Sequence, residues 1–121
     1  MKITLQTADC RFKQIGDWPE YDDIRCLPLG NWQYEALVLI HELVESLDCK
    51  RLGIKPEDVD KFDIAFNGDG EPGDVTDCPY RSSHQLATVI EMMIATHWGI
   101  SFSDYLRITN HIGAVYHGTN E

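Results

Sequence analysis

The sequence predicts a single α+β domain in which two or three short antiparallel strands, within about residues 2–29, precede three to four helices. Apolar residues alternate with polar ones near the N-terminus, whereas from residue 31 onward they recur at steps of three and four. The chain has 121 residues, which is the size of one domain. Hydrophobic residues make up 43% of it, which is enough for a core and excludes wholesale disorder.

The strands are predicted from short apolar groups that turn residues separate. Ile3 and Leu5 alternate with polar neighbours, as in a half-buried strand. Further apolar residues lead to the turn at Gly16, and another apolar group at residues 24–27 ends before Pro28. We therefore expect antiparallel strands joined by turns.

Helix start and stop signals divide the rest of the chain. Asn31 is a good N-cap for the first helix and Gly53 a good C-terminal stop. Pro56 is placed for the first turn of the second helix, and Gly99 ends the third. The four predicted helices cover residues 32–52, 56–66, 82–98 and 102–108.

The third helix is expected to bury large apolar residues that recur at helical spacing. These are Leu86, Val89, Ile90, Met93 and Ile94. The tail from Asn110 is polar or small, so we expect it to fray. Residues 68–79 contain three glycines and two prolines, which predicts a surface loop without helix or strand.

The charge of the chain is strongly negative, because 20 Asp and Glu residues against 10 Lys and Arg residues leave a formal charge of −10. This excess repels phosphate backbones and anionic lipid, so we expect neither nucleic acid nor membrane as a partner. The longest apolar run, residues 36–40, is too short for a membrane span, and the N-terminus lacks a signal-peptide pattern. The four scattered cysteines predict buried, reduced thiols in the cytoplasm.

The candidate site begins on the first helix with the residues His41-Glu42-Leu43-Val44-Glu45. His41 and Glu45 are four residues apart, about 40° around the helix axis, so both side chains can reach one ion. Two ligands on one helix, with a Glu beside the first, resemble the His-Glu-x-x-His zinc helix, in which that Glu takes a proton from metal-bound water. By this pattern His41 and Glu45 are metal ligands and Glu42 is the general base.

A third ligand has to come from elsewhere in the chain. His84 is the best candidate, because it opens the third helix directly after the glycine-rich loop. With His84 the site has two nitrogens and one oxygen, the ligand set of many hydrolytic zinc enzymes. Asp63 is the next candidate, as a ligand or as a carboxylate that orients a histidine, and Glu91 and Arg81 can support the site. Arg81 can clamp a substrate carboxylate or pair with Asp63.

The same residues allow another interpretation. A histidine at the edge of an amphipathic helix with Glu beside it is commonly part of a half-buried polar pair, so the cluster can be a buried ionic network without metal. The acidic residues between 69 and 77 suggest calcium, but Pro72 and Pro79 break the spacing of a calcium-binding loop. Solvated acids are the simpler interpretation of that loop.

Eight short motifs stand in a specific order between residues 11 and 105. They are Arg11-Phe12, Gly16-Asp17-Trp18, residues 39–45, Gly53-Ile54, residues 59–63, residues 71–74, Pro79-Tyr80-Arg81 and His84. In this order they resemble a family of small uncharacterised phage and prophage proteins. The resemblance implies a setting in the cytoplasm of a bacterial host and a phage or host protein as partner, but no particular activity.

The first predicted helix separately resembles the active-site helix of zinc metallopeptidases, the zincins. This resemblance rests on His41, Glu42 and Glu45, with Glu45 in place of the usual second His. It implies a zincin-like helix core, a zinc ion or another divalent transition metal, and a peptidase-like hydrolase activity.

Two functions are therefore expected from different classes. The first is a metal-dependent hydrolase in which His41, Glu45 and His84 hold zinc. The second is a non-enzymatic phage accessory or structural protein, in which the same residues form a buried ionic network and the acidic surface binds a basic protein. A shared ion requires the three side chains to converge within about 4 Å of a common point.

Overall fold

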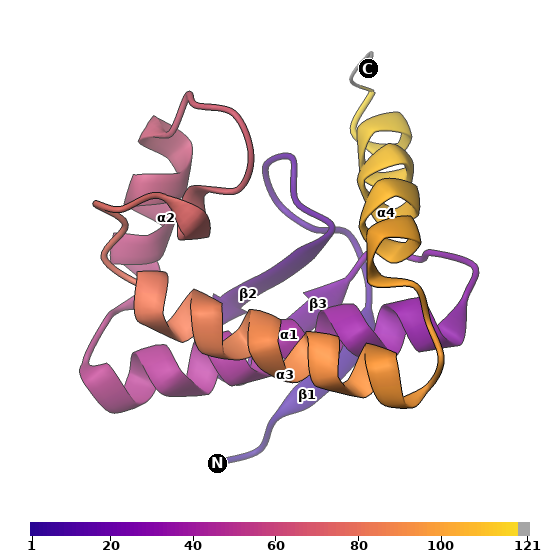
Figure 1. Ribbon diagram of the computed structural model, residues 1–121. Helices are drawn as coiled ribbons and strands as arrows, with labels where there is room; N and C mark the ends of the chain where they lie inside the picture. Colours follow the sequence, from indigo (N-terminus) through magenta and orange to yellow (C-terminus); the bar gives the residue numbers. More distant parts are fainter. Residues whose placement is uncertain (119–121) are drawn as a thin grey trace.

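The computed structural model describes residues 1–118, which form a small mixed sheet followed by helices, so the predicted α+β class is confirmed (Figure 1). The strands are β1 (Thr4–Thr7), β2 (Gly16–Glu20) and β3 (Asp23–Cys26). The helices are α1 (Trp32–Leu52), α2 (Pro56–Ala65), the short 3₁₀ helix η1 (Pro72–Asp74), α3 (Arg81–His97) and α4 (Phe102–Tyr116). Within this described part of the chain, no helix combines the length and the apolar character that crossing a membrane requires.

The sheet has the order β1-β3-β2, and the prediction of purely antiparallel strands is wrong. β2 and β3 are antiparallel, whereas β1 pairs with β3 in parallel, with Leu5 opposite Ile24. The reason is that β3 inserts between β1 and β2, so it runs with one neighbour and against the other. All residues of β1 are exposed, as an edge strand allows, while Ile24 in the central strand is fully buried.

α1 is the central element of the fold. It lies between the sheet and α3, as Figure 1 shows. Asn31 caps its start by accepting hydrogen bonds from the backbone N–H groups of Gln33 and Tyr34, and Gly53 ends it with a φ of 76°. Both predicted helix signals are therefore present. Because neighbours cover α1 on two sides, it can supply side chains to the core and to a polar site between the layers.

The core consists of two clusters, one on each side of the middle of α1. One includes Leu37 and Tyr105 and joins α1, α3 and α4 to β3. The other includes Trp18 and Val59 and joins β2, α1 and α2. All four cysteines are buried and free.

α3 turns a different face toward α1 from the one that its hydrophobic spacing predicts. Leu86, Val89 and Met93 are 44%, 53% and 66% exposed, so their prediction as inward-facing residues is wrong, and Ile90 and Ile94 are only half-buried. The buried residues of α3 are small or polar: Ser83, His84, Ala87, Glu91 and Ala95. Hydrophobic spacing identifies a face of a helix, but it does not say what that face packs against.

α4 continues to Tyr116, so the prediction that it ends near residue 108 and that the chain frays from Asn110 is wrong. The additional turns pack on the loop between β1 and β2. A Cβ atom at Gly113 would lie 2.5 Å from a methyl carbon of Ile15, which shows how closely the backbone of α4 approaches that side chain. Small residues in this stretch permit a contact that helix propensity does not reveal.

Candidate metal centre

The side chains of His41, Glu45 and His84 converge between α1 and α3. Each offers a ligand atom, and these atoms all lie within 4.8 Å of one another. Oε2 of Glu45 is 3.4 Å from Nε2 of His41 and 2.9 Å from Nδ1 of His84. Helical spacing places His41 beside Glu45, and the packing of α3 on α1 brings in His84 from 39 residues further along the chain. The structure therefore brings the three predicted ligands together.

A carboxylate holds the other ring nitrogen of His41. Nδ1 of His41 is 2.8 Å from Oε1 of Glu91, whose second oxygen accepts a hydrogen bond from the hydroxyl of Tyr105. A carboxylate only accepts, so we assign the hydrogen to Nδ1, and Nε2 then faces Glu45. Burial by itself would lower the pKa of His41, but the hydrogen bonds with Glu45 and Glu91 raise it well above its ordinary value.

His84 is arranged in the same way. Its Nδ1 faces Glu45, and its Nε2 lies 3.1 Å from a carboxylate oxygen of Glu71 and 3.2 Å from one of Asp74. The backbone of Gly73 touches the imidazole, because a Cβ atom there would lie 2.5 Å from Cγ of His84. Burial by itself would lower the pKa of His84, but Glu45 and Glu71 raise it to about 10.

Glu45 is the residue that both histidines share. Its Oε1 accepts a hydrogen bond of 2.9 Å from the indole N–H of Trp18, which leaves Oε2 for the two rings. Burial by itself would raise the pKa of Glu45, but the hydrogen bonds from His41 and His84 lower it to about 2. Glu45 is therefore ionised at neutral pH.

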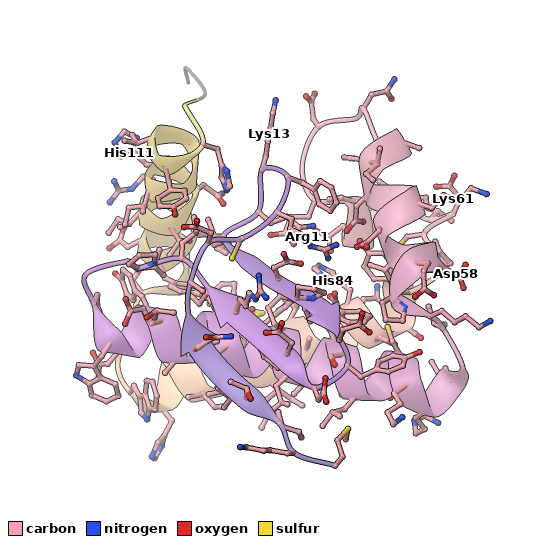
Figure 2. All side chains as sticks on the ribbon, turned by 180° about the vertical axis from the view of Figure 1, so that it is seen from behind. Arg11, Lys13, Asp58, Lys61, His84 and His111 are labelled. Carbon is pink, nitrogen blue, oxygen red and sulfur yellow. The ribbon has the colours of Figure 1, made fainter. Side chains whose placement is uncertain are left out.

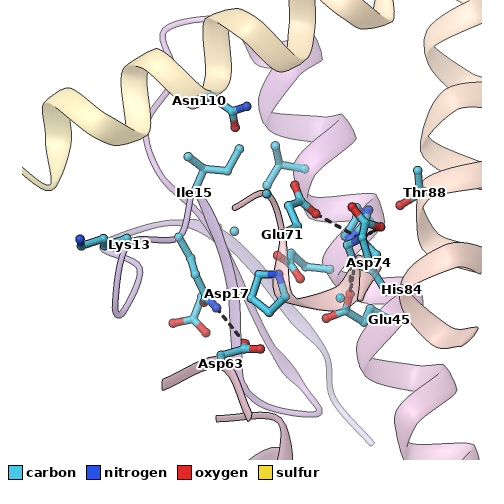
Figure 3. Close-up of a pocket in the computed structure, with 18 of the residues that line it drawn as sticks. Lys13, Ile15, Asp17, Glu45, Asp63, Glu71, Asp74, His84, Thr88 and Asn110 are labelled. Atoms are coloured by element: carbon cyan, nitrogen blue, oxygen red, sulfur yellow. Dashed lines mark hydrogen bonds and ion pairs between the residues drawn. The ribbon is translucent and has the colours of Figure 1, made fainter. Parts of the chain in front are cut away.

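A cavity of about 1270 Å³ opens beside this cluster, between the β1–β2 loop, α1, α2, the loop before α3, and α4 (Figure 3). Glu42 lies in its wall, and a Cβ atom at Gly16 would be 2.5 Å from a carboxylate oxygen of Glu42. Burial and the neighbouring Glu45 raise the pKa of Glu42 well above its ordinary value. Within residues 1–118, Glu42 makes no hydrogen bond or ion pair, unlike the other carboxylates that line the cavity.

Asp63 and Arg81 lie outside the cluster. Asp63 accepts hydrogen bonds from the hydroxyl of Tyr80 and, at 3.1 Å, from the side-chain amide of Gln14. Figure 3 shows it on the side of the pocket away from His84. Burial raises the pKa of Asp63 to about 6. Arg81 donates to the backbone carbonyl of Asp74 at 3.4 Å, so within the described chain the predicted pair between Arg81 and Asp63 is not formed.

Arg11 ties α2 to the wall of the cavity. Its guanidinium bonds both carboxylate oxygens of Asp17 in β2 at 3.0 Å and those of Asp60 in α2 at 2.9 and 3.0 Å. Figure 2 shows Arg11 between β2 and α2, on the same side of the molecule as His84. Bidentate pairs of this kind fix the planes of both partners, so Arg11 sets the position of α2 relative to the site.

The residues that orient the three predicted ligands could not all be found from the sequence. Trp18 and Tyr105 have no spacing signal, because tertiary packing alone places them beside Glu45 and Glu91. The sequence favours solvated acids at Glu71 and Asp74, yet both reach His84. The sequence signal for these two is the motif at residues 71–74, in which they flank Pro72-Gly73.

Comparisons of the chain with protein-family models, with curated protein sequences and with solved structures found no match. The resemblances to phage proteins and to zincins therefore remain predictions from the sequence, and the function has to be argued from the geometry.

Proposed function

We propose that this protein is a metal-dependent hydrolase in which His41, Glu45 and His84 hold zinc or another divalent transition metal. One observation carries the proposal: each of the three side chains has a second partner on its far side. These partners are Glu91 for His41, Trp18 for Glu45, and Glu71 with Asp74 for His84. Metal ligands in proteins are commonly oriented by such outer hydrogen bonds, which fix the ring nitrogen that faces the ion.

Two of the three separations between ligand atoms are close to those around a tetrahedral ion. Bonds of about 2.1 Å at tetrahedral angles separate neighbouring ligand atoms by about 3.4 Å. Nε2 of His41 and Oε2 of Glu45 are 3.4 Å apart. The 2.9 Å between Nδ1 of His84 and the same oxygen is a hydrogen-bond length. It would open by about 0.5 Å around an ion, and a fourth position would remain for water.

The raised pKa values of the histidines are consistent with this proposal. Without metal, both rings are protonated at neutral pH and the cluster closes as hydrogen-bonded ion pairs. A divalent cation that displaces two protons leaves the net charge of the cluster unchanged. The same carboxylates can therefore balance the positive charge of the protonated, metal-free cluster or of the metal-bound cluster. Metal binding requires no new charged partner.

Glu42 is the residue that we assign as general base. It follows His41 on α1, lines the cavity, and has no donor of its own among the described residues. A bound cation nearby would lower the raised pKa of Glu42, because positive charge favours the ionised carboxylate. It could then take a proton from water at the fourth metal position.

The metal content of the purified protein tests the proposal. We expect close to one equivalent of a transition metal by plasma mass spectrometry, or stoichiometric uptake of zinc after dialysis against a chelator. His41→Ala and His84→Asn should abolish uptake, because each removes one of three ligands. His97→Ala is the matched control, since His97 is exposed on α3 and lies outside the cluster. Folded wild-type protein that takes up no metal would contradict the proposal.

A second function is favoured by a specific observation. The cluster is closed by direct hydrogen bonds of 2.8 Å between His41 and Glu91 and 2.9 Å between His84 and Glu45. These bonds would suit a non-enzymatic accessory protein in which the network only holds α1 and α3 together. In that case His41→Ala lowers the melting temperature in the presence of chelator as much as in the presence of zinc, because a buried carboxylate loses its partner.

The biological setting is proposed from the sequence alone. The motifs that resemble phage and prophage proteins support a role in the cytoplasm of an infected bacterium, with a phage or host protein as partner. The peptidase-like character is supported by the order His41, Glu42, Glu45 on one helix. It is tested by assaying peptide hydrolysis with the zinc-loaded protein.

A further inference from the structure

The outer face of α3 carries a mostly apolar row that nothing within residues 1–118 covers. Leu86, Val89, Met93 and Thr96 follow one another at steps of three, four and three, and all four are exposed. Figure 1 shows this helix as the outermost layer, with α1 behind it. Steps of three and four are the spacing by which one helix packs along another. We call this row, together with the neighbouring Met92, the outer seam of α3.

The opposite face of α3 is already packed against α1. Ser83, Ala87 and Ala95 are fully buried against α1, and the buried polar residues between them belong to the candidate metal centre. The outer seam therefore cannot turn inward without removing His84 from Glu45. The large apolar side chains of α3 are left to solvent, with Met93 66% exposed.

The distribution of charge limits which partners can bind to the outer seam. Asp, Glu, Lys and Arg make up 25% of the chain, yet among residues 82–103 Glu91 is the only one of them, and Glu91 and the ionisable His84 are both buried on the inner face. A basic partner would be drawn to acidic surface, which this face does not offer. A second copy carries the same charge of −10, so it can approach only where acids are absent.

We propose that the outer seam of α3 is the contact between two copies of this chain, with the two α3 helices packed antiparallel. A two-fold axis between Val89 and Met93 would place each of these residues opposite the other in the partner copy. Leu86 would then face the small Thr96, so that a large side chain lies opposite a small one at each end of the contact. A shallow hollow lined by Val89, Met92, Met93, Thr96 and His97 lies along this row and can receive the side chains of the second copy.

The contact is small, so the association is expected to be weak. A stable interface buries about 800 Å² on each partner, from about 20 to 30 residues. The outer seam and its flanks provide fewer residues, and we expect a dissociation constant on the order of 10 to 100 µM. Methionine adapts its shape to a partner, which suits such a contact.

Sedimentation equilibrium between about 5 and 500 µM protein tests the proposal, since this range spans the expected dissociation constant. Wild type should change from monomer to dimer across the range, and Val89→Glu with Met93→Glu should remain monomeric throughout. The control is Val115→Glu, which adds one of the two negative charges of the test variant, at an apolar residue on α4 that is 64% exposed. Its dimerisation should match wild type. Wild type that is monomeric at every concentration overturns the proposal and leaves an apolar protein partner as the occupant.

A charge-pair variant tests the antiparallel arrangement separately. In Val89→Glu with Met93→Lys, each new carboxylate would face a new ammonium of the partner copy, so dimerisation should recover at least tenfold relative to the double glutamate variant. Parallel helices would bring like charges together and show no recovery. Neither measurement depends on metal, so both remain informative whatever the function of the candidate centre.

Discussion

Nδ1 of His41 lies 2.8 Å from a carboxylate oxygen of Glu91, which is 50 residues further along the chain and on a different helix. This contact decides which nitrogen of His41 faces Glu45. It also links the candidate centre to the core, because Glu91 is held in turn by the buried Tyr105.

Glu91→Gln should weaken zinc binding by about 10- to 100-fold while leaving all three ligands in place. The amide keeps the size of the side chain, but it cannot accept from both His41 and Tyr105. The ring of His41 therefore loses the partner that fixes its orientation. Competition with a chromophoric chelator measures the affinity. Unchanged affinity in a folded variant would show that Glu91 does not position His41.

Gly73→Ala should weaken zinc binding about tenfold or more without changing any charged group. The new methyl group would lie 2.5 Å from Cγ of His84, so either the ring or the loop must shift. Thr76→Ala is the control, because it alters an exposed residue of the same loop. Equal affinity of the two variants would mean that the loop moves away without disturbing His84.

Glu42→Gln should keep zinc and lose hydrolysis by about 100-fold or more, since proton transfer by a positioned side chain contributes factors of this size. A library of quenched fluorescent peptides gives the activity, and plasma mass spectrometry gives the metal content. Loss of metal together with activity would instead assign Glu42 to the ligands.

Zinc affinity should rise with pH between about 6.5 and 10, because zinc must displace the proton that His84 holds up to its pKa of about 10. Each displaced proton raises the apparent affinity about tenfold per pH unit. Calorimetry in buffers of different ionisation enthalpy counts the protons, and we expect between one and two per zinc. A count of zero would contradict the protonated cluster.

Asp63 should make the free energy of unfolding fall as pH rises from about 4 to 6. Its pKa is raised from 3.8 to about 6 by burial, so the folded state binds the proton more tightly than the unfolded state does. This contribution is fully present below pH 3.8 and is lost as pH passes 6.

Asp63→Asn should remove the part of the pH dependence of the free energy of unfolding that Asp63 contributes. Relative to wild type, urea unfolding in the presence of chelator should show the variant gaining on the order of 1 to 2 kcal/mol between about pH 4 and 6, after allowance for solvent screening. Asp22→Asn, in the exposed turn between β2 and β3, is the control that removes the same charge.

Local signals in the sequence predict the elements that local interactions determine. Asn31 and Gly53 bound α1 because capping depends on a few neighbouring residues. His41 and Glu45 share a face for the same reason. The direction of the outer seam, the length of α4 and the parallel pairing of β1 depend on which surfaces meet, so periodicity could not predict them.

The sequence likewise predicts one part of the candidate centre and not the other. Residue type and spacing predict its three candidate ligands, but they do not predict most of the groups that orient them. Trp18 is a typical core residue by composition, and only the folded chain places its indole N–H on Glu45. Outer partners of this kind are chosen by packing, so a single sequence carries little trace of them.

The hydrogen bond from Trp18 to Glu45 gives the protein a built-in optical probe. Trp18 is 5% exposed, whereas Trp32 and Trp98 are 70% and 36% exposed and contact each other with tilted rings, where α1 begins and α3 ends. A water-soluble quencher would reduce the fluorescence of Trp32 and Trp98 first. The remaining emission would come from Trp18, whose indole donates to Glu45. Any event that changes the charge around that carboxylate can then be followed in the unlabelled protein, in real time.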